Sequence, residues 1–155
     1  MSGMKLQGGQ GVTVQYAVAT EGVPDEQDIR TWAGLALQEA GEEREVVVRI
    51  VDEAEITALN RQYRGKDGPT NVLSFPCEGF PGVATELLGD VVICAPVVAG
   101  EAVTQGKSPQ SHWAHLVMHG VLHLLGYDHH TDAEAQHMES REIALLSELG
   151  YSDPY

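Results

Sequence analysis

The sequence has few basic residues and only two cysteines. Nine lysines and arginines stand against 23 aspartates and glutamates, which gives a formal net charge of −14 at pH 7. A protein that coats nucleic acid without sequence preference depends on basic residues to neutralise phosphates, so this composition argues against that class. Cys77 and Cys94 show no Cys-x-x-Cys spacing. Two buried free thiols explain them better than a disulfide or a zinc-binding pair.

Long hydrophobic runs are also absent. The most apolar stretches, near residues 48 and 95, are far shorter than the roughly 20 residues that a membrane-spanning helix requires. Residues 1–10 contain one lysine and no apolar segment, so we expect a flexible leader rather than a secretory signal, and a cytoplasmic protein. With 155 residues, 43% of them hydrophobic, the chain can bury its own core, and we expect a single domain over residues 11–155.

Hydrophobic periodicity and helix-capping residues predict the order of the elements. Strands are expected over residues 12–19, 45–51, 71–76 and 89–95, and helices over residues 25–39, 52–63, 96–106, 109–126 and 131–150. Two of the helices begin with predicted capping boxes, Asp52 with Glu55 and Thr131 with Glu134. This order predicts an α+β fold with a roughly four-stranded mixed sheet covered by about five helices.

All seven histidines lie between residues 112 and 137. His119 and His123 are four residues apart on a predicted helix, so both side chains project from one face at a spacing that can seat one metal ion. Gly126 can end the helix and turn the chain back, which would let His129 reach the same ion. Three neutral imidazoles favour Zn²⁺, and the missing fourth protein ligand is typical of a catalytic site.

The other histidines carry weaker predictions. His115 lies one turn before His119, and it could orient a ligand, contact substrate or belong to the core. Asp128 is either a carboxylate partner of the metal ligands or an exposed turn residue. The remaining three are expected at the surface or as capping residues: His112, His130 and His137.

The histidine spacing coincides with that of zinc peptidases that carry H-E-x-x-H-x-x-G-x-x-H. The position after the first histidine is Gly120 here, where those peptidases have glutamate. Peptidase chemistry needs that glutamate as its general base. The substitution argues strongly against proteolysis.

Several segments together closely resemble the YbeY family of bacterial endoribonucleases, which act in ribosomal RNA maturation. They are HGVLHLLGYDH at 119–129, RQYRGKDGPTNVLSFP at 61–76, LGDVVI at 88–93, HL at 115–116 and LLSELG at 145–150. The match runs in order from about residue 45 to residue 150. The resemblance implies an α+β fold, one zinc ion per chain and an arginine, Arg64, in the active-site cleft. It also implies three zinc ligands: His119, His123 and His129.

The chemistry of phosphodiester cleavage supports this interpretation. The transition state places negative charge on non-bridging oxygens, which Zn²⁺ and the Arg64 guanidinium could stabilise, although a solvated arginine at a helix end is an equal alternative. Arg61 and Lys66 are more suited to guiding an RNA backbone. Single-stranded RNA is the expected substrate, because it needs only a short basic strip and some stacking surface. The possible stacking residues are Tyr63, Phe75 and Tyr127, with Phe75 better suited to the core.

The sequence therefore predicts a zinc-dependent, single-strand-specific endoribonuclease of ribosomal RNA maturation and ribosome quality control, with the ribosome or its small subunit as partner. Two alternatives remain open. A non-catalytic RNA-binding or ribosome-assembly factor could use zinc structurally, but such a site normally has four protein ligands. A metal-dependent peptide or small-molecule hydrolase would need a carboxylate base that the motif lacks.

Overall fold

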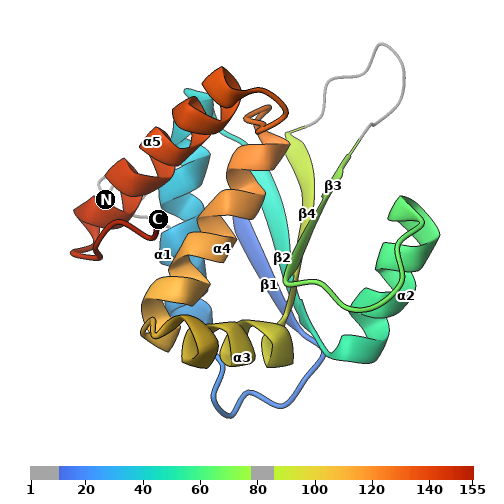
Figure 1. Cartoon of the computed structure of the whole chain (residues 1–155). Helices are drawn as coiled ribbons and strands as arrows, with labels where there is room; N and C mark the ends of the chain where they lie inside the picture. Colours follow the sequence, from blue (N-terminus) through green and yellow to red (C-terminus); the bar gives the residue numbers. More distant parts are fainter. Residues whose placement is uncertain (1–10, 78–85) are drawn as a thin grey trace.

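The structure, a computed structural model, describes residues 11–77 and 86–155 (Figure 1). The predicted leader at residues 1–10 lies outside the described residues. The strands are β1 (Val12–Tyr16), β2 (Glu45–Val51), β3 (Val72–Pro76) and β4 (Leu87–Cys94). The helices are α1 (Glu26–Leu37), the 3₁₀ turn η2 (Gln38–Ala40), α2 (Glu53–Arg64), α3 (Ala95–Gln105), α4 (Pro109–Leu124) and α5 (Asp132–Glu148). No helix in this described part is long and apolar enough to cross a membrane.

The four strands form one mixed sheet in the order β1-β2-β4-β3. β2 pairs in parallel with both β1 and β4, whereas β3 pairs antiparallel with β4 and forms one edge. Parallel strands are usually covered on both faces, which explains the near-continuous apolar run of β2. Its Val48 and Ile50 are completely buried. The predicted α+β fold with a four-stranded mixed sheet is thus confirmed.

Helices cover both faces of the sheet unequally. Figure 1 shows α1, α4 and α5 gathered on one face and α2 on the other. The larger core lies under the first group, where Trp32 of α1 and Trp113 of α4 pack with the central strands and with Met138 of α5. The smaller core lies under α2 and contains Val51, Ile56, Leu73, Val92 and Cys94.

One predicted cap takes a different form. The capping box between Thr131 and Glu134 is present at the start of α5. At the start of α2, Asp52 accepts a hydrogen bond from the Glu55 backbone N–H, but the Glu55 carboxylate does not return one. It instead accepts two hydrogen bonds from Arg49 on β2, at 2.7 and 3.1 Å. A paired guanidinium is a stronger partner for a carboxylate than one backbone N–H.

Helix α4 approaches the sheet closely at Gly120. A Cβ atom added there would lie 2.5 Å from Cγ1 of Val91 on β4 and 3.4 Å from the Ser74 hydroxyl on β3. The same Ser74 hydroxyl donates a 2.9 Å hydrogen bond to the Gly120 carbonyl. The glycine is therefore required by the distance between helix and sheet, and a side chain at this position would point into the core.

We expect Gly120→Ala to lower the free energy of unfolding by about 1–3 kcal/mol, the usual cost of overpacking a close contact. The control is Gly100→Ala on α3, where an added Cβ has no atom within 4 Å. That variant should be neutral or up to about 1 kcal/mol more stable, because alanine favours helix over glycine. Urea denaturation of both variants and the parent measures the difference. Equal stabilities would contradict the close contact.

Candidate metal centre

Three histidines meet where α4 ends. Gly126, with φ at 103°, follows the helix, and its N–H donates to the His123 carbonyl while the Tyr127 N–H donates to the Leu122 carbonyl. This pair of hydrogen bonds is a Schellman motif, which reverses the chain directly after the last helical turn. The expected turn at Gly126 is thereby confirmed, and it carries His129 back toward α4.

The three side chains lie close enough to share one ion. One ring nitrogen from each of His119, His123 and His129 lies within 4.8 Å of the others, and the group could hold a metal ion. The ring centroids are 4.8 Å apart for His119 and His123 and 5.0 Å apart for His123 and His129. Burial, followed by the neighbouring His119 and His129, lowers the pKa of His123. The lowered pKa favours the neutral imidazole, the form that binds metals.

A buried carboxylate, Glu142 of α5, lies behind this group. Its side chain is completely buried, and Oε2 lies 2.5 Å from Nδ1 of His119. The other oxygen, Oε1, lies 3.3 Å from Nε2 of His115 and also contacts the Tyr155 hydroxyl. When Nδ1–H of His119 donates to the carboxylate, the Nε2 lone pair is left free for a metal, and the ring orientation is fixed.

Glu142 is ionised despite its burial. Burial raises the pKa of this carboxyl group, but hydrogen bonds from His115 and His119 outweigh it and lower the pKa to about 2. The sequence reasoning missed Glu142 because its partners are distant in the chain. A signal was available: Glu142 lies four residues from both Met138 and Leu146, inside the buried stripe of α5. A charged residue in such a stripe requires a polar partner.

The remaining histidines are partly as expected. His115 is buried and points toward Glu142 rather than joining the group of three. His112 was expected at the surface or as a cap, which is wrong. It is buried, with Nε2 2.9 Å from Glu101, because α3 packs over that side of α4 and brings the carboxylate with it. His130 and His137 are exposed, as predicted.

Asp128 takes the role of a turn residue. Its carboxylate accepts a 2.8 Å hydrogen bond from the His129 backbone N–H and lies 3.0 Å from Nε2 of His130. The hydrogen bond from the His129 backbone is the main reason why the pKa of Asp128 is lowered. Asp128 thus fixes the backbone at His129. Its carboxylate forms no hydrogen bond with the rings of the three histidines in the described part of the chain.

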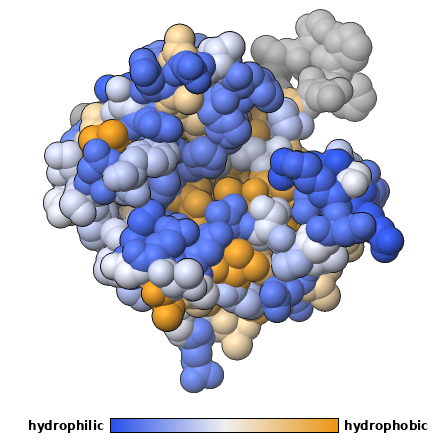
Figure 2. Space-filling model, viewed as in Figure 1, coloured by the Kyte–Doolittle hydropathy of each residue, from blue (hydrophilic) through white to orange (hydrophobic). Residues whose placement is uncertain are grey.

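The three histidines line a groove of about 1040 Å³ that also contains Arg64. Figure 2 shows the hollow between α2 and the layer of α4 and α5, with apolar side chains at its floor. Arg64 is exposed at the end of α2, and its guanidinium has no hydrogen bond or ion pair with the described residues. The other arginine of the groove, Arg49, is paired with Glu55. Arg64 is therefore available to an anion in the groove.

The other predicted RNA contacts lie in different places. Tyr63 and Phe75 line the groove and pack edge to face, with centroids 5.2 Å apart, and Tyr63 is 61% exposed. Arg61 is an exposed neighbour of Asp67, 3.6 Å away, and Lys66 is also exposed. Neither cation is among the described residues that line the groove. Tyr127 instead packs against His137 of α5.

Both cysteines are free, but only one is buried. Cys94 lies in the smaller core, where burial raises the pKa of its thiol. Cys77 is exposed, contrary to the expected burial. It follows β3, the edge strand of the sheet, and lies beyond the last residue of that strand.

The fold and the site together define an α+β protein with a three-histidine group that opens on a groove, where one arginine has no partner among the residues that the structure describes. Comparison with known proteins shows that the chain belongs to the family described as Endoribonuclease YbeY, whose sequence pattern matches residues 16–150. The resemblance recognised in the sequence is thus confirmed, and the chain is a member of an endoribonuclease family.

Individual relatives cover nearly the whole chain. A protein named Endoribonuclease YbeY from Methylococcus capsulatus is 57% identical over 144 residues, covering 93% of this chain and 94% of the relative. Another of that name, from Halorhodospira halophila, is 52% identical over 141 residues, covering 89% and 92%. The solution structure of a Thermotoga maritima protein matches with a TM-score of 0.59 and 25% identity, over 92% of this chain and 97% of the other.

We expect Glu142→Gln to lower the free energy of unfolding of the metal-free protein by about 2 kcal/mol, because hydrogen bonds to a charged group are lost inside the core. The control is Glu148→Gln, an exposed position on the same helix, where the change should stay within about 0.5 kcal/mol. Urea denaturation with a chelator present measures both. If the two variants lose equal stability, the buried carboxylate does not hold α4 and α5 together.

Proposed function

We propose that this protein is a zinc-dependent endoribonuclease that cleaves single-stranded RNA. Its proposed role is ribosomal RNA maturation and ribosome quality control in the cytoplasm. The proposed partner is the ribosome or its small subunit. The proposed catalytic domain spans residues 11–155. The observation that carries the proposal is that His119, His123 and His129 line the same groove as Arg64. Membership of an endoribonuclease family supports the reaction class.

The donor atoms of the group suit zinc. His119, His123 and His129 would hold one ion per chain through imidazole nitrogens, whereas Mg²⁺ and Ca²⁺ prefer oxygen ligands. The contact between His119 and Glu142 supports this assignment, because carboxylates commonly fix the ring of a metal-binding histidine in this way. When bound, zinc would supply Lewis-acid stabilisation of the phosphoryl oxygens.

The residues of the groove would act on the RNA itself. The Arg64 guanidinium would donate hydrogen bonds to non-bridging oxygens of the scissile phosphate, whose negative charge grows in the transition state. The exposed Tyr63 ring, held by Phe75, would offer a stacking surface for an unpaired base. With a single unpaired arginine in the described groove, a single strand fits this surface better than a duplex. Arg61 and Lys66, at the surface beside α2, would guide the flanking backbone.

Two alternatives are less well supported. A non-catalytic RNA-binding or ribosome-assembly factor with structural zinc would need a fourth protein ligand, whereas the group among the described residues comprises three. A peptide or small-molecule hydrolase would need a general base. The peptidase position of that base is Gly120, which faces the sheet rather than the groove. Incubation of the zinc-loaded protein with single-stranded RNA, duplex RNA and casein separates the three functions, and we expect cleavage of the single-stranded RNA.

The metal assignment predicts that His123→Ala abolishes stoichiometric zinc binding, because one of three ligands is lost. The matched control is His137→Ala, an exposed histidine outside the group, which should bind one zinc per chain like the parent. Metal analysis after chelator treatment and zinc titration measures both variants. Full occupancy in His123→Ala would disprove the assignment. Returning single metals to the stripped parent then identifies the ion that restores RNA cleavage.

The role of Arg64 predicts that Arg64→Ala keeps its zinc but cleaves RNA about 10²–10³-fold more slowly, the usual loss when one donor to transition-state charge is removed. Arg64→Lys should recover little of this rate, since an ammonium cannot form the planar bidentate contact. The measurement is single-turnover cleavage at saturating enzyme, with zinc content determined for each variant. A parental rate in Arg64→Ala would show that this arginine takes no part in the chemistry.

Arg61→Ala and Lys66→Ala are to be compared with Arg64→Ala, because all three cations lie at or just after the end of α2. Each should weaken RNA binding and flatten its dependence on salt, with no comparable loss of cleavage at saturation, because a backbone contact adds affinity rather than transition-state stabilisation. The matched arginine control is Arg30→Ala on α1. Arg30 is a partly exposed arginine that pairs with Glu26 outside the groove, and this variant should behave like the parent.

A further inference from the structure

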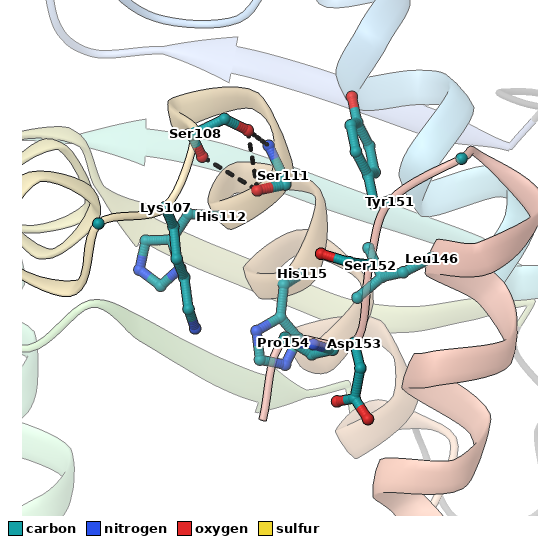
Figure 3. Close-up of a pocket in the computed structure, with 12 residues that line it drawn as sticks. Lys107, Ser108, Ser111, His112, His115, Leu146, Tyr151, Ser152, Asp153 and Pro154 are labelled. Atoms are coloured by element: carbon teal, nitrogen blue, oxygen red, sulfur yellow. Dashed lines mark hydrogen bonds between the residues drawn. The ribbon is translucent and has the colours of Figure 1, made fainter.

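The segment after α5 returns to α4 and reaches the back of the metal centre. Together with α4 it encloses a pocket of about 400 Å³, lined by Ser152, Asp153 and Pro154 on one side and by His112 and His115 on the other. Figure 3 shows Pro154 and Asp153 lying beside His115. The pocket thus lies between the first turns of α4 and the segment after α5, and it is separate from the groove that contains Arg64.

Tyr155, at the end of this segment, contacts two residues of the buried network. Its hydroxyl lies 3.2 Å from Nε2 of His115 and forms a hydrogen bond with Oε1 of Glu142. Its ring meets the His115 ring edge to face, with centroids 5.4 Å apart. Burial and the Glu142 carboxylate raise the pKa of Tyr155, so the hydroxyl remains a donor. Although the residue as a whole is 60% exposed, the Tyr155 hydroxyl therefore forms a hydrogen bond with a buried carboxylate.

The backbone of the segment forms two hydrogen bonds that do not involve this hydroxyl. The Tyr151 N–H donates to the Leu146 carbonyl at 3.0 Å, and the Tyr155 N–H donates to the Asp153 carboxylate at 2.8 Å. The first joins the start of the segment to the end of α5, and the second lies within the segment, so neither of them ties Tyr155 itself to α4. Removal of the hydroxyl alone leaves both of these hydrogen bonds, and the contact between the Tyr155 and His115 rings, in place.

The two oxygens of the Glu142 carboxylate contact different residues. Oε2 faces His119, while Oε1 faces His115 and the Tyr155 hydroxyl. A carboxylate that accepts hydrogen bonds on both oxygens cannot rotate or shift without breaking one of them. The orientation of the oxygen that meets His119 therefore depends on the contacts made by the other oxygen.

We propose that Tyr155 is a positioning residue of the metal centre: its hydroxyl fixes Glu142, and Glu142 fixes the His119 ring for metal binding. This inference rests on the proposed function, because it takes His119, His123 and His129 as the metal ligands. Tyr155 would thus support Glu142, which in turn supports the ligand His119, and it belongs to a segment that does not line the groove.

The test is Tyr155→Phe, which removes the hydroxyl and keeps the ring against His115. Zinc affinity is measured by competition with a chromogenic chelator, and the geometry of the site by the visible absorption spectrum of the Co²⁺-loaded protein. We expect about tenfold weaker zinc binding, the lower end of the effect of residues that support metal ligands, together with an altered Co²⁺ spectrum. The matched control is Tyr151→Phe in the same segment, whose ring Figure 3 shows directed away from His115. That variant should bind both ions like the parent.

A double-mutant cycle separates positioning from a general structural effect. Tyr155→Phe should cost much less zinc affinity in a Glu142→Gln background than in the parent, because the hydroxyl acts through that carboxylate. Additive losses would overturn the proposal, and so would parental zinc affinity and a parental Co²⁺ spectrum in Tyr155→Phe. If Tyr155→Phe matches the parent while His123→Ala loses the metal, the metal centre stands and the role of Tyr155 fails. If the parent itself binds no zinc, both proposals fail together.

Discussion

The contact between α4 and the sheet is the constraint on which the rest of the structure depends. At Gly120 the helix lies so close to β4 that a single added carbon would meet Val91. This contact fixes the rotation of α4 about its axis, and the rotation decides where every α4 side chain points. His119 and His123 are thereby directed toward the end of the helix where the groove opens, while His115 is directed toward α5.

Much of the fold and the group of three histidines follow from local patterns. β2 and α4 are recognisable because burial leaves a periodic or continuous apolar run, and the four-residue spacing of His119 and His123 with Gly126 behind them is a local signal of a shared site. The partners of His112 and Glu142 are not predictable in this way, although the place of Glu142 in the buried stripe of α5 does indicate that it needs a polar partner. Each depends on a partner from another element, Glu101 for the first and His119 for the second, and pairings across the fold leave no periodic trace in the sequence.

The groove is of mixed charge: the described residues that line it include two arginines, Arg49 and Arg64, and three carboxylates, Glu55, Asp90 and Asp128. The chain carries a formal net charge of −14, yet Arg64, at the end of α2, has no ion-pair partner among the described residues and lines the same groove as the three imidazoles. Of the three carboxylates, Glu55 is paired with Arg49. An acidic protein can in this way present one localised site for an anion, because local pairing rather than net charge decides which cations are available.

The two walls of the groove rest on cores of different size. Arg64 belongs to α2, whose buried support is limited to Ile56 and a few residues of the sheet and α3, whereas His119 belongs to a helix packed inside the larger core. Elements with fewer buried contacts open at a lower free energy than the rest of a protein. The wall that carries Arg64 is thus the more readily opened one, and its opening would widen the groove without moving His119.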